Sequence, residues 1–290
     1  YIYYKIGLNK MMIIPKVQTQ YLIKEEETDG HSPLRFVCSN DTIYFCKYLT
    51  SINQVEINCL AYEIVAHYLL KELNIPTPDI ALVEVAEGTL IKEKIKRNKR
   101  LKEKDTCFGS KNLATASEVN DLQKCNTKKE FNALLNPEDI IRIAMFDLWI
   151  NNVDRGKFFN PGFNYNLLLN KVGTKQQIVA FDHAFIFGGV NQIGIFNPKM
   201  PFETTNKLHE TDYYKSVIRY FDYTKFVEIV DNFVLLLKTN HQNCINEVIL
   251  QLENVWKITP NLAQKIQEYL SDEALIEKVR STIISSKTPQ

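Results

Sequence analysis

Three oxygen-bearing side chains, those of Asp154, Asn166 and Asp182, lie beside short apolar runs of the chain. Asn166 directly precedes the apolar run 167–169, and Asp182 directly follows the run 179–181. Phosphoryl transfer from a nucleotide needs one Asp to orient the acceptor hydroxyl, and carboxylate and amide oxygens to hold Mg²⁺ on the phosphates. The three residues are therefore candidates for this chemistry.

The two apolar runs are predicted to be the strands of a β-hairpin, because residues 170–175 between them contain Gly173, which favours a turn. In such a hairpin Asn166 lies before the first strand and Asp182 after the second. Both side chains would then emerge at the same end of the hairpin. Asp154 lies a short loop upstream and can reach the same place.

Asp154 is the candidate catalytic residue, since an aspartate there would accept a hydrogen bond from an incoming hydroxyl and align it for attack. Asn166 and Asp182 are the candidate metal ligands, because their hard oxygen donors suit Mg²⁺. Asn160 and Asn164 compete with Asn166 for the first position. Asn166 is preferred because it directly precedes an apolar strand.

Lys47 lies in a β-like apolar segment and is a candidate for pairing with the α- and β-phosphates. A solvent-facing lysine of a strand explains this position equally well. The functional interpretation requires a carboxylate from the following helix. Glu56 and Glu63 are seven residues apart and lie on similar faces of that helix. Glu63 is preferred because it lies deeper in the apolar stretch, and Glu56 is the alternative.

Residues Gly30, His31 and Ser32 form a short predicted loop between strands. Glycine allows backbone N–H groups to approach a phosphate, which makes this loop a candidate phosphate-binding segment. A plain β-turn is the more frequent explanation for a single glycine.

The composition predicts a globular protein: the 290 residues are 45% apolar and 24% charged, which excludes bulk disorder. The formal net charge is +1, so no global charge favours nucleic acid or an anionic membrane as partner. The longest basic run, 92–102, is a solvated face or an anion-attracting rim near a nucleotide site.

Six cysteines occur, without a C-x-x-C pair or a metal-like arrangement with histidine. Cys38, Cys46 and Cys59 lie in apolar contexts and are predicted to be core residues. The expected compartment is the reducing cytoplasm. No apolar stretch approaches the length of a membrane span.

The expected fold class is α+β, with a small lobe at 12–95, a large and mostly helical lobe at 96–290, and a ligand-binding cleft between them. The small lobe should contain strands near 17–23, 35–38 and 42–49, a helix at 53–73, and a hairpin of 79–85 with 89–93. The segment 97–128 is ill-defined, with a loop at Gly109 and Ser110. Further helices are expected near 137–149, 211–222, 224–238, 240–256, 261–270 and 272–284.

Together these residues resemble the HipA-like kinases, over roughly 17–190. The most specific segment is 146–155, Phe-Asp-Leu-Trp-Ile-Asn-Asn-Val-Asp-Arg, followed by Asn166 with its strand and by 180–183, Ala-Phe-Asp-His. Residues 29–33, Asp-Gly-His-Ser-Pro, occupy the position of the phosphate loop. Also similar are 62–63 and 73–85 in the small lobe.

The resemblance implies a two-lobed protein-kinase-like fold that uses ATP and Mg²⁺. It makes Asp154 the catalytic aspartate, Asn166 and Asp182 the metal ligands, and Lys47 the phosphate-pairing lysine. It also places the linker between the lobes, where backbone groups meet adenine, at Glu93, Lys94 and Ile95.

The implied activity is phosphorylation of serine or threonine in proteins, so the expected partners are a nucleotide and a protein substrate. By the same resemblance Ser32 is a candidate autophosphorylation site. A phosphate there would inhibit, because its charge would occupy the place of the ATP phosphates. One alternative keeps the fold but has a small-molecule alcohol as acceptor.

The sequence departs from the ordinary kinase pattern in the catalytic loop. Asn166 follows Asp154 at a longer distance than usual, and Phe159 stands at the ordinary asparagine position. Asp182 is followed by His-Ala rather than Phe-Gly. A second alternative is therefore a catalytically silent nucleotide-binding protein that regulates a partner.

Overall fold

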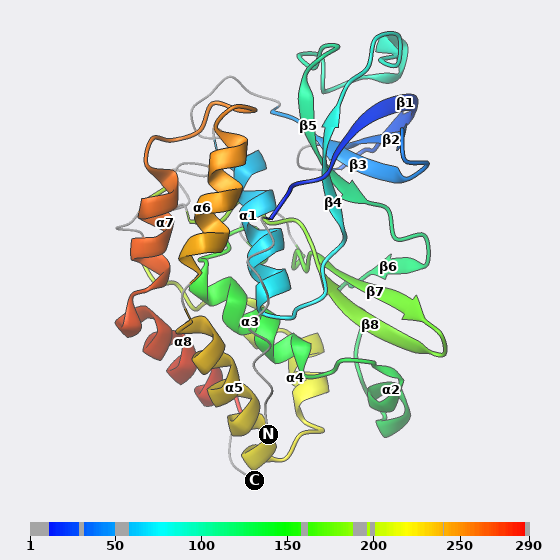
Figure 1. Ribbon diagram of the computed structural model, residues 1–290. Helices are drawn as coiled ribbons and strands as arrows, with labels where there is room; N and C mark the ends of the chain where they lie inside the picture. Colours follow the sequence, from blue (N-terminus) through cyan, green and yellow to red (C-terminus); the bar gives the residue numbers. More distant parts are fainter. Residues whose placement is uncertain are drawn as a thin grey trace.

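The computed structural model describes residues 12–28, 32–49, 58–157, 162–187, 196–197, 201–239 and 241–287. It has an α+β architecture with a sheet lobe and a helical lobe (Figure 1). The predicted fold class is confirmed at this level. Among the described residues, no helix combines the length and apolar character needed to cross a membrane.

The sheet lobe is a closed barrel with the strand order β1-β2-β3-β5-β4. A parallel pairing of β1 with β4 closes it. Its strands are β1 (Lys16–Glu25), β2 (Leu34–Cys38), β3 (Ile43–Lys47), β4 (Ile80–Glu84) and β5 (Thr106–Lys111). In β2 every second side chain is buried, the period expected when one face of a strand packs on a core. The strands predicted near 17–23, 35–38, 42–49 and 79–85 are confirmed.

The strand predicted at 89–93 is wrong, because residues Lys92–Lys94 form the short 3₁₀ helix η2. The partner of β4 is β5, which also pairs with β3. Gly109, predicted to mark a loop, lies inside β5. A Cβ atom at Gly109 would lie 2.4 Å from Cγ2 of Val83 on β4, so the glycine permits a close approach of side chain and backbone.

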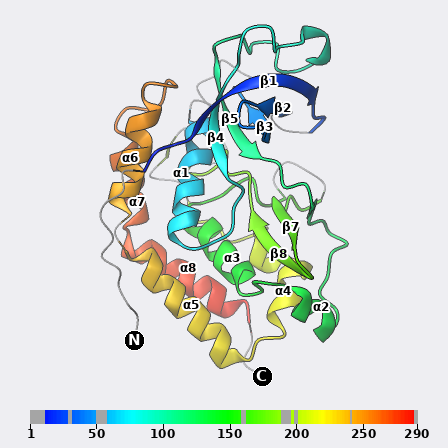
Figure 2. The ribbon, with the colours of Figure 1, turned by 45° about the vertical axis from the view of Figure 1, so that its right-hand side comes forward.

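The helical lobe contains the predicted helix after Asn136 and the predicted C-terminal helices (Figure 2). Its helices are α2 (Lys128–Ala133), α3 (Asp139–Trp149), α4 (Asp212–Ile218), α5 (Tyr223–Leu237), α6 (Gln242–Leu252), α7 (Leu262–Leu270) and α8 (Glu273–Ser285), with the 3₁₀ helix η4 (Leu208–Glu210). The short helix α2 was not predicted.

Helix α1 (Cys59–Glu72) follows β3 in the chain but packs on the helical lobe. Its apolar residues belong to the same buried cluster as those of α3, α5, α6, α7 and α8. The barrel strands contribute Leu22, Phe36, Cys46, Val83 and others to a separate cluster. The predicted core cysteines Cys38, Cys46 and Cys59 are buried.

The predicted hairpin is confirmed and consists of β7 (Leu167–Val172) and β8 (Lys175–Ala180), with β6 (Ala116–Glu118) beside β7. Gly173 in its turn has φ +60°, a left-handed conformation that favours glycine. At the opposite end Leu167 pairs with Ala180. The residues before β7 and after β8 therefore lie next to each other.

Candidate active site

The loop after α3 positions Asp154 through a chain of local hydrogen bonds. The Asn152 side chain accepts a bond from the backbone N–H of Asp154 at 3.0 Å. Asn152 in turn donates to Oδ1 of Asp147 on α3 at 3.1 Å. The loop is thereby fixed to a buried helix, which gives Asp154 a defined backbone position.

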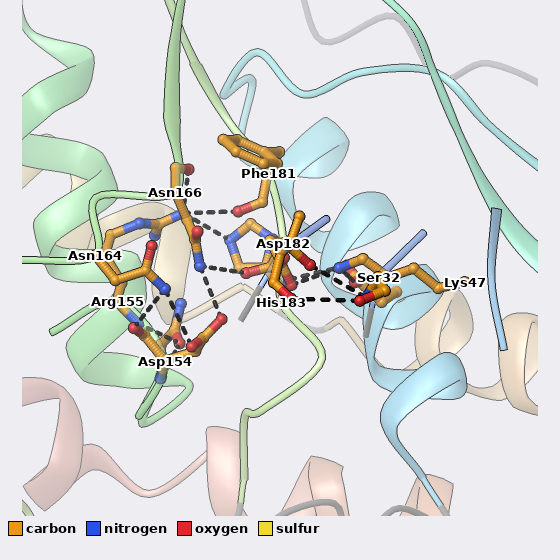
Figure 3. A network of polar contacts seen from close by, with 12 residues as sticks. Ser32, Lys47, Asp154, Arg155, Asn164, Asn166, Phe181, Asp182 and His183 are labelled. Carbon is orange, nitrogen blue, oxygen red and sulfur yellow. Dashed lines mark hydrogen bonds and ion pairs between the residues drawn. The ribbon is translucent and has the colours of Figure 1, made fainter. Parts of the chain in front are cut away.

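Two asparagine side chains meet the Asp154 carboxylate, as Figure 3 shows. Asn166 donates from Nδ2 to Oδ2 at 2.9 Å, and Asn164 donates from Nδ2 to Oδ1 at 3.1 Å. Nδ2 of Asn166 also lies 3.5 Å from the carbonyl oxygen of Asp182. The structure therefore brings Asp154, Asn166 and Asp182 together at the end of the hairpin, as the sequence predicts. Asn160 lies outside the described residues.

Asn166 and Asp182 both adopt left-handed backbone conformations, with φ of 46° and 58°. Residues other than glycine seldom do so, and Asn and Asp tolerate it best. Such conformations persist where surrounding contacts fix them, and they are frequent at functional sites. Here the left-handed conformation of Asn166 turns the backbone just before β7, and that of Asp182 turns it just after β8.

Burial raises the pKa of Asp154 to about 6, and the negative charge of Asp182 acts in the same direction. The hydrogen bonds from Asn166 and Asn164 and the charge of Lys47 partly oppose this increase. A carboxylate with this pKa is ionised near neutral pH and can accept a hydrogen bond from a hydroxyl.

Lys47, at the end of β3, is buried between two carboxylates. Its Nζ lies 2.7 Å from Oε1 of Glu63 on α1 and 2.7 Å from Oδ1 of Asp182. Burial disfavours the ammonium form, but the charges of Asp182 and Glu63 outweigh this and raise the pKa of Lys47 above its usual range. The lysine is therefore a fixed positive charge that links the barrel to the hairpin end.

Glu63 also reaches the segment after Asp182, because its Oε2 accepts a 2.8 Å bond from the backbone N–H of His183. Burial raises the pKa of Glu63 to about 7, although Lys47 lowers it; the nearby charge of Asp182 adds to the increase. Glu63, the glutamate preferred in the sequence prediction, thus contacts Lys47. The alternative, Glu56, lies outside the described residues.

The donor set at the hairpin end suits Mg²⁺. The Asn166 amide nitrogen is engaged with Asp154, so its remaining polar side-chain atom is an oxygen, and Asp182 supplies a carboxylate. Amide and carboxylate oxygens are the ligands that Mg²⁺ prefers. Within the described residues no group of three His, Cys, Asp or Glu side chains forms an alternative metal site.

A pocket of about 380 Å³ opens beside Asn166. Phe181, the residue before Asp182, lies in its wall. The remaining walls are residues 118–120, at and after the end of β6, and residues 162–167, before and at the start of β7. The pocket therefore adjoins the candidate metal ligands and has room for part of a small molecule.

Ser32 is the described member of the predicted phosphate loop; Gly30 and His31 lie outside the described residues. Its side chain is fully buried, and its φ is 46°. Arg97 donates from Nη1 to Oγ of Ser32 at 2.9 Å, and Asn98 donates to the Ser32 carbonyl at 2.7 Å. Ser32 is thus held by the segment that follows η2.

The predicted position of the interlobe linker at Glu93, Lys94 and Ile95 is wrong. These residues precede β5, and β5 still belongs to the barrel, so the chain leaves the barrel only after Lys111. Nζ of Lys94 lies 3.4 Å from the Leu22 carbonyl on β1, and Ile95 packs on the barrel cluster. The expected contact with adenine at 93–95 rested on the linker position and loses that support.

Arg155, Asn152 and Asp147 are site residues to which the sequence assigns no role. The guanidinium of Arg155 is fully buried and pairs with Asp147. Both residues lie in the segment that carries the family resemblance. The only signal was an arginine directly after the candidate catalytic aspartate, because a sequence does not reveal that an arginine is buried.

Three solved structures that are similar to this chain at 13–14% identity are structures of kinases. Among solved structures, the Helicobacter pylori proinflammatory kinase CtkA is similar with a TM-score of 0.40 and 14% identity, covering 91% of this chain and 92% of that chain. The Golgi casein kinase with Mn/ADP bound is similar with a TM-score of 0.47 and 14% identity, covering 94% of this chain and 74% of that chain. Another structure of the Golgi casein kinase is similar with a TM-score of 0.48 and 13% identity, covering 94% of this chain and 72% of that chain.

A search of curated proteins finds no match. The family model for HipA-like kinases matches residues 22–201, which is more than half of the chain. This range contains Lys47, Glu63, Asp154, Asn166 and Asp182. The chain therefore belongs to the HipA-like kinase family.

Proposed function

We propose that this kinase transfers the γ-phosphoryl group of ATP, with Mg²⁺, to a serine or threonine hydroxyl of a protein. One observation carries the proposal: a continuous polar network runs from Lys47 through Asp182 and Asn166 to Asp154. It combines a cation for phosphates, oxygens for a metal and a carboxylate for a hydroxyl. These are the parts that phosphoryl transfer requires.

Each residue of the network then has a distinct role. Asp154 accepts a hydrogen bond from the acceptor hydroxyl and orients it for in-line attack. Lys47 pairs with the α- and β-phosphates, and Glu63 holds Lys47 in place. Asn166 and Asp182 would hold Mg²⁺, which neutralises charge on the phosphate oxygens when bound.

The sheet and helical parts would act as the two lobes of a protein-kinase-like fold, with the nucleotide between them. The proposed lobes are 12–95 and 96–290, with two amendments: β5 (Thr106–Lys111) belongs with the barrel, and α1 packs on the helical lobe. The pocket beside Asn166 and Phe181 adjoins the candidate metal ligands, but its described lining holds no residue of the barrel strands, so we place the phosphates rather than the nucleoside next to it, between Lys47 and the metal ligands.

The test is incubation with labelled ATP and Mg²⁺, alone and with a cell lysate, followed by identification of the labelled species. We expect labelled serine or threonine in protein, and strong loss of label with Asp154→Asn. Asp212→Asn is the matched control, because Asp212 is an exposed carboxylate paired with Lys124. Label confined to a small molecule would contradict the proposed acceptor, and equal label with Asp154→Asn would contradict the mechanism.

We further propose that Ser32 is phosphorylated by the kinase itself, and only after its loop is released. The support is its complete burial and its bond from Arg97, which keep the hydroxyl away from solvent. Arg97→Ala should therefore increase phosphate at Ser32, measured by mass spectrometry after incubation with ATP. Ser32 that stays unmodified in both proteins, while other substrates are labelled, would contradict this proposal.

A further inference from the structure

Arg155 is a fully buried arginine that directly follows Asp154. Buried arginines are rare unless their donors are paired. Nη1 donates to Oδ1 of Asp147 on α3, and Nε donates to the Tyr165 carbonyl at 2.6 Å. The guanidinium is thus anchored on one side to a helix and on the other to the residue before Asn166.

The remaining nitrogen, Nη2, contacts the chain just before β7 and just after β8, at the open end of the hairpin. It donates to the Asn166 carbonyl at 3.1 Å and to the Phe181 carbonyl at 3.1 Å. The Asn166 carbonyl belongs to one candidate metal ligand. The Phe181 carbonyl belongs to the peptide group that joins Phe181 to the other candidate ligand, Asp182. One planar, rigid group therefore touches the backbone at both candidate ligands (Figure 3).

The β-ladder alone does not fix the hairpin end relative to Asp154. The ladder ends with the pairing of Leu167 and Ala180, and one further bond runs from the Phe181 N–H to the Asn166 carbonyl at 3.2 Å. These bonds join the two strands to each other. Arg155 joins both of them to the loop that carries Asp154 and to α3.

We propose that Arg155 is a positioning residue that sets the spacing of Asn166 and Asp182 and thereby the affinity of the site for its divalent metal. The inference rests on the proposed function, since it assumes that these two side chains bind the metal. Arg155 acts through the backbone of the ligands and touches neither the metal nor the substrate. A lysine cannot replace it, because an ammonium lacks the planar set of donors that reaches all these acceptors.

The first test compares Arg155→Lys with the wild-type protein. The substitution keeps a cation beside Asp147 but removes the bridge between the carbonyls of Asn166 and Phe181. Binding of Mn²⁺ in the presence of ATP is measured by electron paramagnetic resonance of the free ion, and transfer is measured as a function of Mg²⁺. Loss of groups that orient metal ligands typically weakens metal binding about 10- to 100-fold, and we expect a weakening in this range.

Two readouts separate a positioning role from a general structural one. The KM for ATP at saturating metal should change far less than the metal concentration at half-maximal transfer. The control is Arg142→Lys, since Arg142 also pairs with an aspartate of α3, Asp139, but lies outside the network. It should leave the metal dependence unchanged.

Unchanged metal binding in folded Arg155→Lys would overturn the inference while leaving the proposed function intact. Wild-type protein that shows no metal-dependent nucleotide binding would overturn both. If Arg155→Lys does not fold, the double variant Asp147→Asn/Arg155→Gln removes the buried pair together and is measured in the same way. Weakened metal binding in that variant supports the inference, and wild-type binding contradicts it.

Discussion

Asp154 lies between the side chains of Asn164 and Asn166, and burial together with the charge of Asp182 raises its pKa to about 6. Below this pH the carboxyl group is protonated and no longer accepts a bond from the acceptor hydroxyl. Transfer should therefore increase as the pH rises from 5 to 7, with a midpoint near 6 in kcat/KM, which reports the free enzyme.

The same pH profile measured on Asn164→Ala provides the internal check. Asn164 donates to the ionised form of Asp154 and so lowers its pKa. Removing that bond should move the midpoint to higher pH. A profile that is flat between pH 5 and 8 in the wild-type protein would contradict the role of Asp154 as the group that accepts the hydroxyl proton.

Glu63 joins Lys47 to the backbone N–H of His183. Glu63→Gln preserves the shape of the side chain but removes the negative charge that holds Lys47. We expect transfer to fall by about 10²-fold, the size of effect typical for a lost electrostatic contact in an active site. Steady-state kinetics would measure it.

Glu72→Gln is the matched control for this prediction, because Glu72 lies on the same helix and contacts His241 at 2.7 Å, away from Lys47. It should leave the kinetics near those of the wild type. An equal loss of activity in both variants would indicate a general effect on α1 rather than a specific role for Glu63.

The convergence of Asn166 and Asp182 was predictable, because the residues just before and just after the two strands of a hairpin lie close to each other. Asp154 was expected to join them because only a short loop separates it from the hairpin. The contact of Lys47 with Glu63 was also anticipated, because Glu63 lies deeper in the apolar stretch of the helix than the alternative, Glu56. Arg155 was not, since its role depends on acceptors supplied by backbone carbonyls, which every residue has. Sequence patterns identify reactive side chains more readily than the groups that orient them.

At the scale of elements, the turn of the β7–β8 hairpin depends on Gly173 at φ +60°. A Cβ atom there meets no other atom within 4 Å, so Gly173→Ala introduces backbone strain alone. We expect a loss of about 1 kcal/mol in the free energy of unfolding, measured with urea. Kinase activity should persist, because the turn is at the opposite end of the hairpin from the site.

Gly173→Asn is the companion variant, since asparagine tolerates the left-handed region better than alanine does. It should retain most of the stability that alanine loses. Equal stability of the alanine variant and the wild-type protein would contradict the assigned turn geometry.

Strand β5 depends on Gly109, where a Cβ atom would lie 2.4 Å from Cγ2 of Val83 and 3.3 Å from the Ala81 carbonyl. Valine has little rotational freedom to yield. Gly109→Ala should therefore cost about 1–3 kcal/mol of stability, the usual range for overpacking. Urea unfolding of the single variant measures this cost.

A double-mutant cycle tests the cause of that cost. Val83→Ala removes the atom that clashes, so the double variant should be more stable than the sum of the two single losses predicts. Additive losses would show that the contact with Val83 is not what requires glycine at this position.

Long elements were predictable and short or atypical ones were not. Helices α3 and α5 to α8 have apolar periodicity over two or more turns, and β1 to β4 have strong strand patterns. Strand β5 carries Gly109 and Ser110, which are typical of turns, and its place in the sheet depends on a close contact with another strand. Strand β6 and helix α2 are too short to show a period.

In the molecule as a whole, the proposed site lies where two hydrophobic cores meet. Lys47 belongs to the barrel, many of whose apolar residues form a cluster of their own, whereas Glu63 belongs to α1, which packs into the core of the helical lobe. Ile80, Leu82 and Phe108 of the barrel also join that second core. The contact between Lys47 and Glu63 therefore spans the two cores. A displacement of the barrel relative to the helical lobe would separate this pair and disconnect the candidate phosphate-binding cation.

The separate roles of Asp154 and Asp182 are tested by measuring Mg²⁺-dependent binding of ATP by calorimetry, alongside phosphate transfer, for Asp154→Asn and Asp182→Asn. We expect that Asp154→Asn binds Mg²⁺ and ATP as the wild type does but transfers phosphate about 10²- to 10⁴-fold more slowly. Asp182→Asn should lose the part of ATP binding that depends on Mg²⁺. Wild-type transfer by Asp154→Asn, or undiminished Mg²⁺-dependent binding by Asp182→Asn, would contradict these roles.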